Sequence, residues 1–189
     1  MPKWTFEPGH TAAEFRARHM MVSYVRGAFK NVRGTLDFDP ANPKLSSVEA
    51  VIDVAGIWTG DAKRDEHLRN PDFLDAEQYP QITFVGDQVE MIGDHDYVVT
   101  GNLTIRGVTR AVPLRVKYLG TWPTPWWVEE DGGEWVNKGP RSRAGFLAET
   151  EINRHDFGMT WNDTMDRGGV VVGNTVHITI DVEAILDDE

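Results

Sequence analysis

The sequence predicts an all-β protein built from antiparallel strands, and two features lead to this prediction. Apolar and polar residues alternate along most of the chain, and turn residues such as Pro40 and Gly107 separate the alternating runs. Because successive side chains of a strand point to opposite faces, this alternation predicts strands with one apolar and one wetter face. Exposed strand edges favour aggregation, so about eight such strands are expected to stack as a sandwich or to close into a barrel.

The alternating runs follow one another through the whole chain. Six of them are strong and two, 35–38 and 81–85, are shorter. The stretch Arg106-Gly107-Val108-Thr109 lies between two strong runs, which predicts a tight hairpin turn. The expected strands cover residues 13–19, 35–38, 48–54, 81–85, 97–105, 112–118, 146–152 and 176–184.

Two segments interrupt the alternation. Residues 59–70 contain helix formers, with Thr59 or Asp61 as N-cap and a stop at Asn70-Pro71, and a further short turn is expected at 74–78. This predicts a short helical insert near residues 61–78. Residues 121–140 hold four of the seven tryptophans and three prolines. We expect this second segment to be a long loop, since proline disfavours regular strand.

Length and charge exclude several classes of protein. The 189 residues fit a single domain spanning 1–189, and the net charge of −11 argues against binding to nucleic acid. Cysteine is absent, which excludes disulfides, thiol chemistry and cysteine-ligated metal. No apolar run is long enough to span a membrane, and the start of the chain lacks a secretory signal. We therefore expect a cytoplasmic protein, or a periplasmic or secreted one if a leader precedes this sequence.

No motif predicts a reactive centre. The six histidines lack the spacing of metal ligands, and the four serines do not occur in a nucleophile-elbow sequence. Glycine-rich phosphate and dinucleotide loops are also missing. The sequence accordingly predicts no catalytic residue, no metal ligand and no cofactor.

The inward face of the expected strands mixes small and large residues, including Ala17, Ala50, Leu103, Phe146 and Ala148. Small residues between large ones leave room for a lumen, and an apolar lumen suits an apolar ligand. The same residues could instead interlock as an ordinary core. From the pattern alone, the filled core is slightly favoured.

Several short motifs together resemble the YceI-like family of lipocalin-like polyisoprenoid-binding proteins. They occur in the family's order and cover nearly the whole chain. The matching stretches are Gly9-His10-Thr11, Val25-Arg26-Gly27-Ala28-Phe29, Trp58-Thr59-Gly60, 64–75, Tyr79-Pro80-Gln81-Ile82-Thr83-Phe84, 101–109 and 152–159. The sequence departs from the family in lacking a leader peptide and in its longer, more aromatic segment 121–140.

The resemblance implies an eight-stranded antiparallel lipocalin-like barrel with a helical insert, enclosing a tunnel for an isoprenoid chain. The implied tunnel-lining residues are Phe15, Ala17, His19, Phe29, Ile52, Phe84, Leu103, Phe146, Ala148 and Ile178. Arg64, Asp65 and His67 are implied at one end, where they would bind a headgroup such as a quinone or a diphosphate. The favoured alternative is that Asp65 pairs with Arg154 to hold the helical insert on the barrel.

The sequence therefore predicts a carrier or sequestering protein for a long isoprenoid lipid, without catalysis. One alternative is an enzyme that acts on a small apolar or prenylated substrate, with His67 and Asp65 as acid and base. Another is a protein-interaction module that uses the Trp-rich segment 121–140. The expected partners are an isoprenoid lipid, a second copy of the chain in a homodimer, and a membrane surface in transient contact.

Overall fold

The structure, a computed structural model, describes residues 1–187 as a closed antiparallel barrel with one short α-helix. Eight strands form the ring in the order β1-β4-β5-β7-β8-β9-β10-β11, and β1 pairs with β11 to close it. The remaining strands β2, β3 and β6 extend the sheet from β11. The predicted eight-stranded barrel is thus confirmed, with three further strands attached to it.

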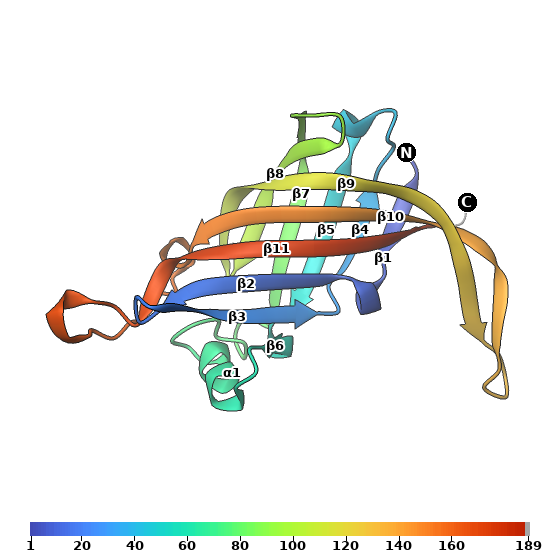
Figure 1. Ribbon diagram of the computed structural model, residues 1–189. Helices are drawn as coiled ribbons and strands as arrows, with labels where there is room; N and C mark the ends of the chain where they lie inside the picture. The colour runs from blue at the N-terminus through green and yellow to red at the C-terminus, as the bar shows by residue number, and fades with distance from the viewer. Residues whose placement is uncertain (188–189) are drawn as a thin grey trace.

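The strands differ greatly in length, and the longest ones cross the others. In Figure 1, β9, β10, β11, β2 and β3 run across the view, while β4, β5, β7 and β8 run from top to bottom. The strands are β1 Lys3–Phe6, β2 Ala12–His19, β3 Ser23–Lys30, β4 Arg33–Asp37, β5 Ser47–Asp53, β6 Ile57–Trp58, β7 Gln81–Met91, β8 Asp96–Ile105, β9 Val108–Glu129, β10 Trp135–Asn153 and β11 Val172–Leu186.

The hairpin predicted at 106–109 is present between β8 and β9. Strand β8 ends at Ile105 and β9 begins at Val108, so the loop has only Arg106 and Gly107. Both have positive φ, 52° and 71°. That combination is the type I′ turn, whose twist matches the twist of the paired strands.

Strand β3 was not among the expected strands. It pairs with β2 along its whole length, from Ala12 opposite Lys30 to His19 opposite Ser23. The alternation of apolar and polar residues along β3 is interrupted at Gly27, because a glycine has no side chain that would indicate which face of the strand it occupies. The glycine is required because the Phe15 ring crosses it: a Cβ at Gly27 would lie 2.4 Å from Phe15 Cζ.

The helical insert is shorter than its predicted bounds. Helix α1 spans Ala62–Arg69, and the chain from 70 to 78 forms turns. Asp61 caps the helix by accepting hydrogen bonds from the backbone N–H groups of Lys63 and Arg64, at 3.0 and 3.1 Å. No helix in the described part of the chain is long and apolar enough to cross a membrane.

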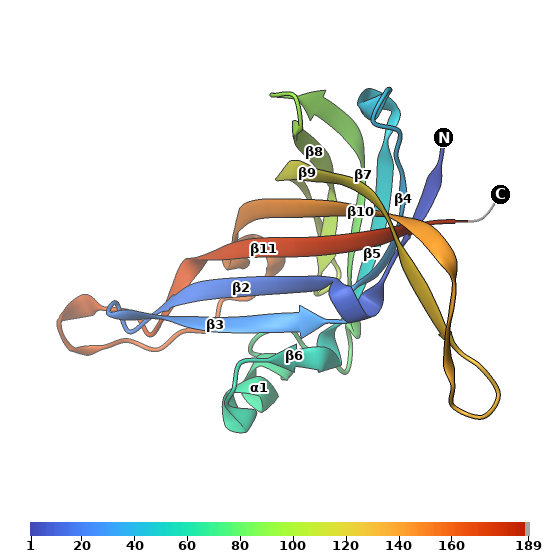
Figure 2. The same ribbon diagram turned by 45° about the vertical axis from the view of Figure 1, so that its right-hand side comes forward.

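The prediction of a long loop for the Trp-rich segment 121–140 is wrong. The ends of β9 and β10 pair here, with Trp122 opposite Arg143 and Trp135 opposite Glu129. They form a two-stranded arm that projects from the barrel (Figures 1 and 2). Strand β8 pairs with β9 only up to Lys117 and β11 pairs with β10 only from Arg143 onward, so both outer edges of the arm are open. Pro123 and Pro125 lie in this part of β9, and a strand with an open edge tolerates proline.

The 3₁₀ helices join the strands at the ends of the barrel. They are η1 Pro8–His10, η2 Pro43–Leu45, η3 Val54–Gly56, η4 Arg154–Phe157 and η5 Asp166–Gly168. Helix η2 lies in the loop from β4 to β5, at the top of Figure 1, whereas α1 lies below the barrel. These two segments therefore cover opposite ends of the barrel.

Candidate functional site: an apolar cavity in the barrel

The inward faces of the strands enclose a cavity of about 280 Å³. Its wall is almost entirely aliphatic and aromatic, and each of the strands β1 to β11 contributes to it. Nine of the residues expected to line a tunnel lie on this wall: Phe15, Ala17, Phe29, Ile52, Phe84, Leu103, Phe146, Ala148 and Ile178. The alternation therefore places these side chains around a cavity, while many of them also pack against one another in two hydrophobic clusters.

Short side chains keep the cavity open. Ala17, Ala50 and Ala148 stand on three different strands and all line the wall. Larger residues on neighbouring positions, such as Phe15 and Ile52, pack at the margins of the free space. Each alanine leaves a gap that a leucine or phenylalanine at the same position would fill.

The cavity reaches both covered ends of the barrel. At the α1 end it is lined by Leu68, Phe73 and Met159. At the η2 end it is lined by Pro43, Ser46 and Val89. None of these six residues was predicted: five lie in segments between strands, which sequence alternation does not describe, and Val89 lies in β7 beyond the expected strand 81–85.

Arg154 lies on the cavity wall and is only 2% exposed. Its guanidinium donates hydrogen bonds to four backbone carbonyls, of Met159 at 2.6 Å, Trp161 at 2.8 Å, Gly173 at 3.0 Å and Val172 at 3.2 Å. Burial lowers its pKa from the usual value for arginine. The side chain thus ties the segment after β10 to the start of β11.

The predicted pairing of Asp65 with Arg154 is wrong. Asp65 Oδ1 accepts hydrogen bonds from the Thr59 backbone N–H at 2.8 Å and from the Thr59 hydroxyl at 2.5 Å. Arg64 Nε donates to the same hydroxyl at 2.7 Å. The two charged side chains therefore hold the N-terminus of α1 against the strand end at Thr59.

Four predicted ligand-binding residues do not line the cavity: His19, Arg64, Asp65 and His67. His67 Nε2 lies 3.0 Å from Asp72 Oδ2, and its ring packs edge-on against Phe73 and Trp161. His19 ends β2, opposite Ser23 and Val172. A headgroup bound inside the barrel would not reach these side chains directly.

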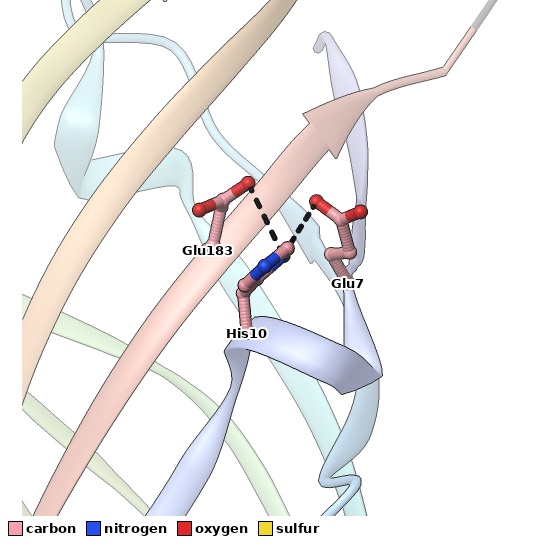
Figure 3. A group of neighbouring side chains, drawn as sticks. All are labelled: Glu7, His10 and Glu183. Carbon is pink, nitrogen blue, oxygen red and sulfur yellow. Dashed lines mark ion pairs between the residues drawn. The ribbon is translucent and has the colours of Figure 1, made fainter. Parts of the chain in front are cut away.

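A second polar cluster lies at the seam where β1 and β11 close the barrel. His10 Nδ1 lies 3.3 Å from Glu7 Oε2 and 3.9 Å from Glu183 Oε1 (Figure 3). These side chains are of types that bind divalent metal ions, and their ligand atoms lie within 4.8 Å of one another. The sequence analysis did not foresee this group, because Glu183 comes from the opposite end of the chain.

Arg143 already neutralises this cluster. Its Nε lies 3.1 Å from Glu7 Oε2 and 2.7 Å from Glu183 Oε1, which are the same oxygens that face His10. A metal ion would have to displace the guanidinium. We therefore assign Glu7, His10, Arg143 and Glu183 to an electrostatic contact that joins η1, β10 and β11.

The two carboxyl groups of the cluster shift in opposite directions. Burial opposes ionisation of Glu7, but hydrogen bonds from Glu183 and Arg143 outweigh it and lower the pKa of Glu7. Burial and the neighbouring Glu7 carboxylate together raise the pKa of Glu183. Glu183 is thus the member of the pair that holds a proton more readily.

Comparisons with known proteins agree with this architecture. The model of the YceI-like domain matches residues 4–184. The protein YceI of Salmonella newport is 37% identical over 179 residues, covering 95% of this chain and 83% of its own. The crystal structure of BcnA from Burkholderia cenocepacia superposes with a TM-score of 0.74 at 25% identity, covering 94% of this chain and 98% of BcnA. A domain from Saccharophagus degradans, described as polyisoprenoid-binding, shares the fold with a TM-score of 0.66 at 13% identity, covering 99% and 100%.

Proposed function

This chain belongs to the YceI-like family, and on that premise we propose that its barrel binds a long-chain isoprenoid lipid as a carrier or sequestering protein. The observation that supports the proposal is the apolar cavity, which reaches from the α1 end of the barrel to the η2 end. Burial of apolar surface stabilises a complex by roughly 25 cal/mol per Å². A flexible hydrocarbon chain can therefore bind in such a cavity without any specific polar contact.

The name of a structural relative agrees with this proposal. The domain from Saccharophagus degradans that shares the fold is described as polyisoprenoid-binding. The two chains are only 13% identical, so the comparison shows that they share a fold and does not show that they share ligand-contact residues. The proposal for this chain therefore depends on its own cavity.

The proposal includes no catalytic step. Asp65 and His67 were the candidates for acid–base chemistry, but they lie outside the cavity wall. Asp65 is engaged with Thr59, and His67 is engaged with Asp72 on the surface. A prenylated substrate in the cavity would not lie against either group.

The proposal is tested by analysing the lipid content of the purified protein. Native mass spectrometry should show a bound species, and solvent extraction should release an isoprenoid. After delipidation, added polyprenols should bind and should raise the unfolding temperature in a concentration-dependent manner. A delipidated, folded protein whose unfolding temperature does not respond to polyprenols or isoprenoid quinones would overturn the proposal.

We infer a second role, in protein association, for the arm formed by β9 and β10. Trp127 and Trp135 lie on one face of the arm and are 55% and 61% exposed. Exposed tryptophans of this kind are typical of interfaces. If they join two copies of this chain, replacing both with serine should convert a dimer to a monomer in sedimentation velocity. An unchanged sedimentation coefficient would refute that role.

A further inference from the structure

The turn between β2 and β3 exposes an unbroken run of apolar side chains. Met20, Met21 and Val22 are 45%, 54% and 81% exposed, and these three residues are called the tip below. The tip lies beside the loop that precedes β11, at the left of the barrel in Figure 1, where the Met20 N–H donates to the Val171 carbonyl at 2.8 Å. Contiguous exposed apolar side chains mark sites of contact with proteins or membranes.

The backbone of the tip is strained. Met20 and Met21 have φ angles of 47° and 62°, and the Val22 N–H donates to the His19 carbonyl at 3.1 Å, as in a type I′ turn. Such a turn favours asparagine and glycine, because most other residues are strained in the left-handed region. The chain therefore holds two methionines where they destabilise the turn. Strain of this kind is typical of functional segments.

Three arginines stand on the outer face of the same hairpin. Arg16, Arg18 and Arg26 are exposed, and segment 15–33 carries five lysines and arginines without any aspartate or glutamate. Arg16 lies directly opposite Arg26, and like charges in this position disfavour strand pairing. No carboxylate within residues 1–187 forms an ion pair with any of the three arginines. Their charge is therefore available to an external anion.

The surroundings of the three arginines leave the hairpin positively charged. The loop beside the tip holds Asp163, Asp166 and Arg167, which is one net negative charge against three positive ones. Across the sheet, Glu151 is already engaged with His177 at 2.6 Å. This end of the barrel is thus cationic on a chain whose net charge is −11.

Charge distinguishes the tip from two other exposed apolar groups. In the β7–β8 turn, Met91 and Ile92 are 43% and 51% exposed, but segment 87–96 carries four acidic residues and no lysine or arginine. The end of the arm, residues 128–138, carries four acidic residues and one lysine. An anionic surface would repel both of these segments and attract the tip.

We propose that the tip docks on an anionic lipid bilayer, with its apolar side chains among the headgroups and the arginines on lipid phosphates. A bilayer offers both partners together, because its phosphates lie directly above apolar acyl chains. The tip also adjoins the cavity, since Ala17 and Val172, which pairs with His19, line the cavity wall. Docking would bring this part of the wall to a membrane. This role goes beyond the proposed function and does not require a bound isoprenoid.

The test measures co-sedimentation of the full chain with vesicles of phosphatidylcholine alone and of phosphatidylcholine mixed with phosphatidylglycerol. Wild type should bind the mixed vesicles, and added salt should weaken this binding by screening the phosphates. Arg18→Gln should lower the affinity by about fivefold, the contribution of one basic residue near an anionic surface. Lys44→Gln, in the exposed part of η2, is the matched control and should leave the affinity unchanged.

The apolar contribution is tested by the double variant Met20→Asn, Met21→Gly, which removes both side chains and supplies the residues that a type I′ turn favours. We expect it to bind the mixed vesicles at least about tenfold more weakly. It should unfold at the same temperature as wild type or at a higher one. The control Met91→Ser, Ile92→Ser removes exposed apolar side chains at the acidic β7–β8 turn and should not change vesicle binding.

The outcomes separate docking from the proposed function. Wild-type protein that does not bind the mixed vesicles, or binds neutral vesicles equally well, would overturn the docking proposal. Unchanged vesicle affinity of the Met20→Asn, Met21→Gly variant would overturn it too, and a lower unfolding temperature of this variant would contradict the strain argument. Polyprenol affinity without vesicles reports on the proposed function alone, and it should be unchanged in this variant because the tip does not line the cavity.

Discussion

Filling the cavity from its wall should exclude the ligand and leave the barrel folded. Ala148 is the position for this experiment, because it lies on β10 between Val116 of β9 and Ile180 of β11 and borders the free space. Ala148→Phe adds a six-carbon ring, which is slightly larger than one five-carbon isoprene unit. The ring would occupy part of the 280 Å³ cavity.

The magnitude follows from the apolar carbon that the ring displaces. Each buried CH₂ contributes about 0.8 kcal/mol, so excluding one isoprene unit costs about 4 kcal/mol. Since about 1.4 kcal/mol corresponds to a factor of ten, the affinity for a long polyprenol should fall by about a thousandfold. The delipidated variant should be at least as stable as wild type, because the phenyl group enters free space instead of an already packed core.

The assay is the dissociation constant of a polyprenol for wild type, Ala148→Phe and Leu147→Phe, with folding checked by circular dichroism. Leu147 is adjacent in β10 and faces away from the cavity, so its variant controls for an added ring on the same strand. A folded Ala148→Phe protein with wild-type affinity would show that the lipid does not occupy this part of the barrel. Equal losses in both variants would also refute the reasoning.

Three further predictions concern stability. Arg154→Met should lower the free energy of unfolding by at least about 3 kcal/mol in urea titrations, because four buried carbonyls lose their donor; a loss below 1 kcal/mol would contradict this. Asp61→Ala should lower the urea midpoint through loss of the N-cap of α1, and an unchanged midpoint would speak against the cap. Because the pKa of Glu183 is raised, the native state binds this proton more tightly than the unfolded chain does. The protonated Glu183 therefore contributes its full stabilisation below pH 4.5, the ordinary pKa of glutamate. This contribution is lost as the pH rises through the shifted pKa of the native state. The free energy of unfolding of wild type relative to Glu183→Gln should therefore decrease over that pH interval, whereas exposed Glu90→Gln should show no such trend.

Local pattern was sufficient for seven of the eight strands of the ring, but it missed β1, the four-residue strand that closes the barrel. The alternation over 176–184 reappears in β11, and the Arg106-Gly107 turn forms because both residues tolerate positive φ. The N-cap at Asp61 and the stop at Asn70 likewise depend on neighbours in sequence. Proline content misled the prediction at 121–140, because a strand with one open edge accommodates proline and the sequence does not show which edges are open.

The inward positions of the cavity, such as Ala17 and Ala148, followed from period-two alternation, since a side chain's face of the sheet depends only on its place along the strand. Whether those inward side chains meet or leave a space depends on the curvature of the closed sheet, which no local segment determines. The same holds for the carbonyls that surround Arg154 and for the contact between Glu7 and Glu183. The Glu7–Glu183 contact joins the two ends of the chain across the closed barrel, and the bonds of Arg154 to Val172 and Gly173 need β11 beside β10, so the tertiary structure decides both.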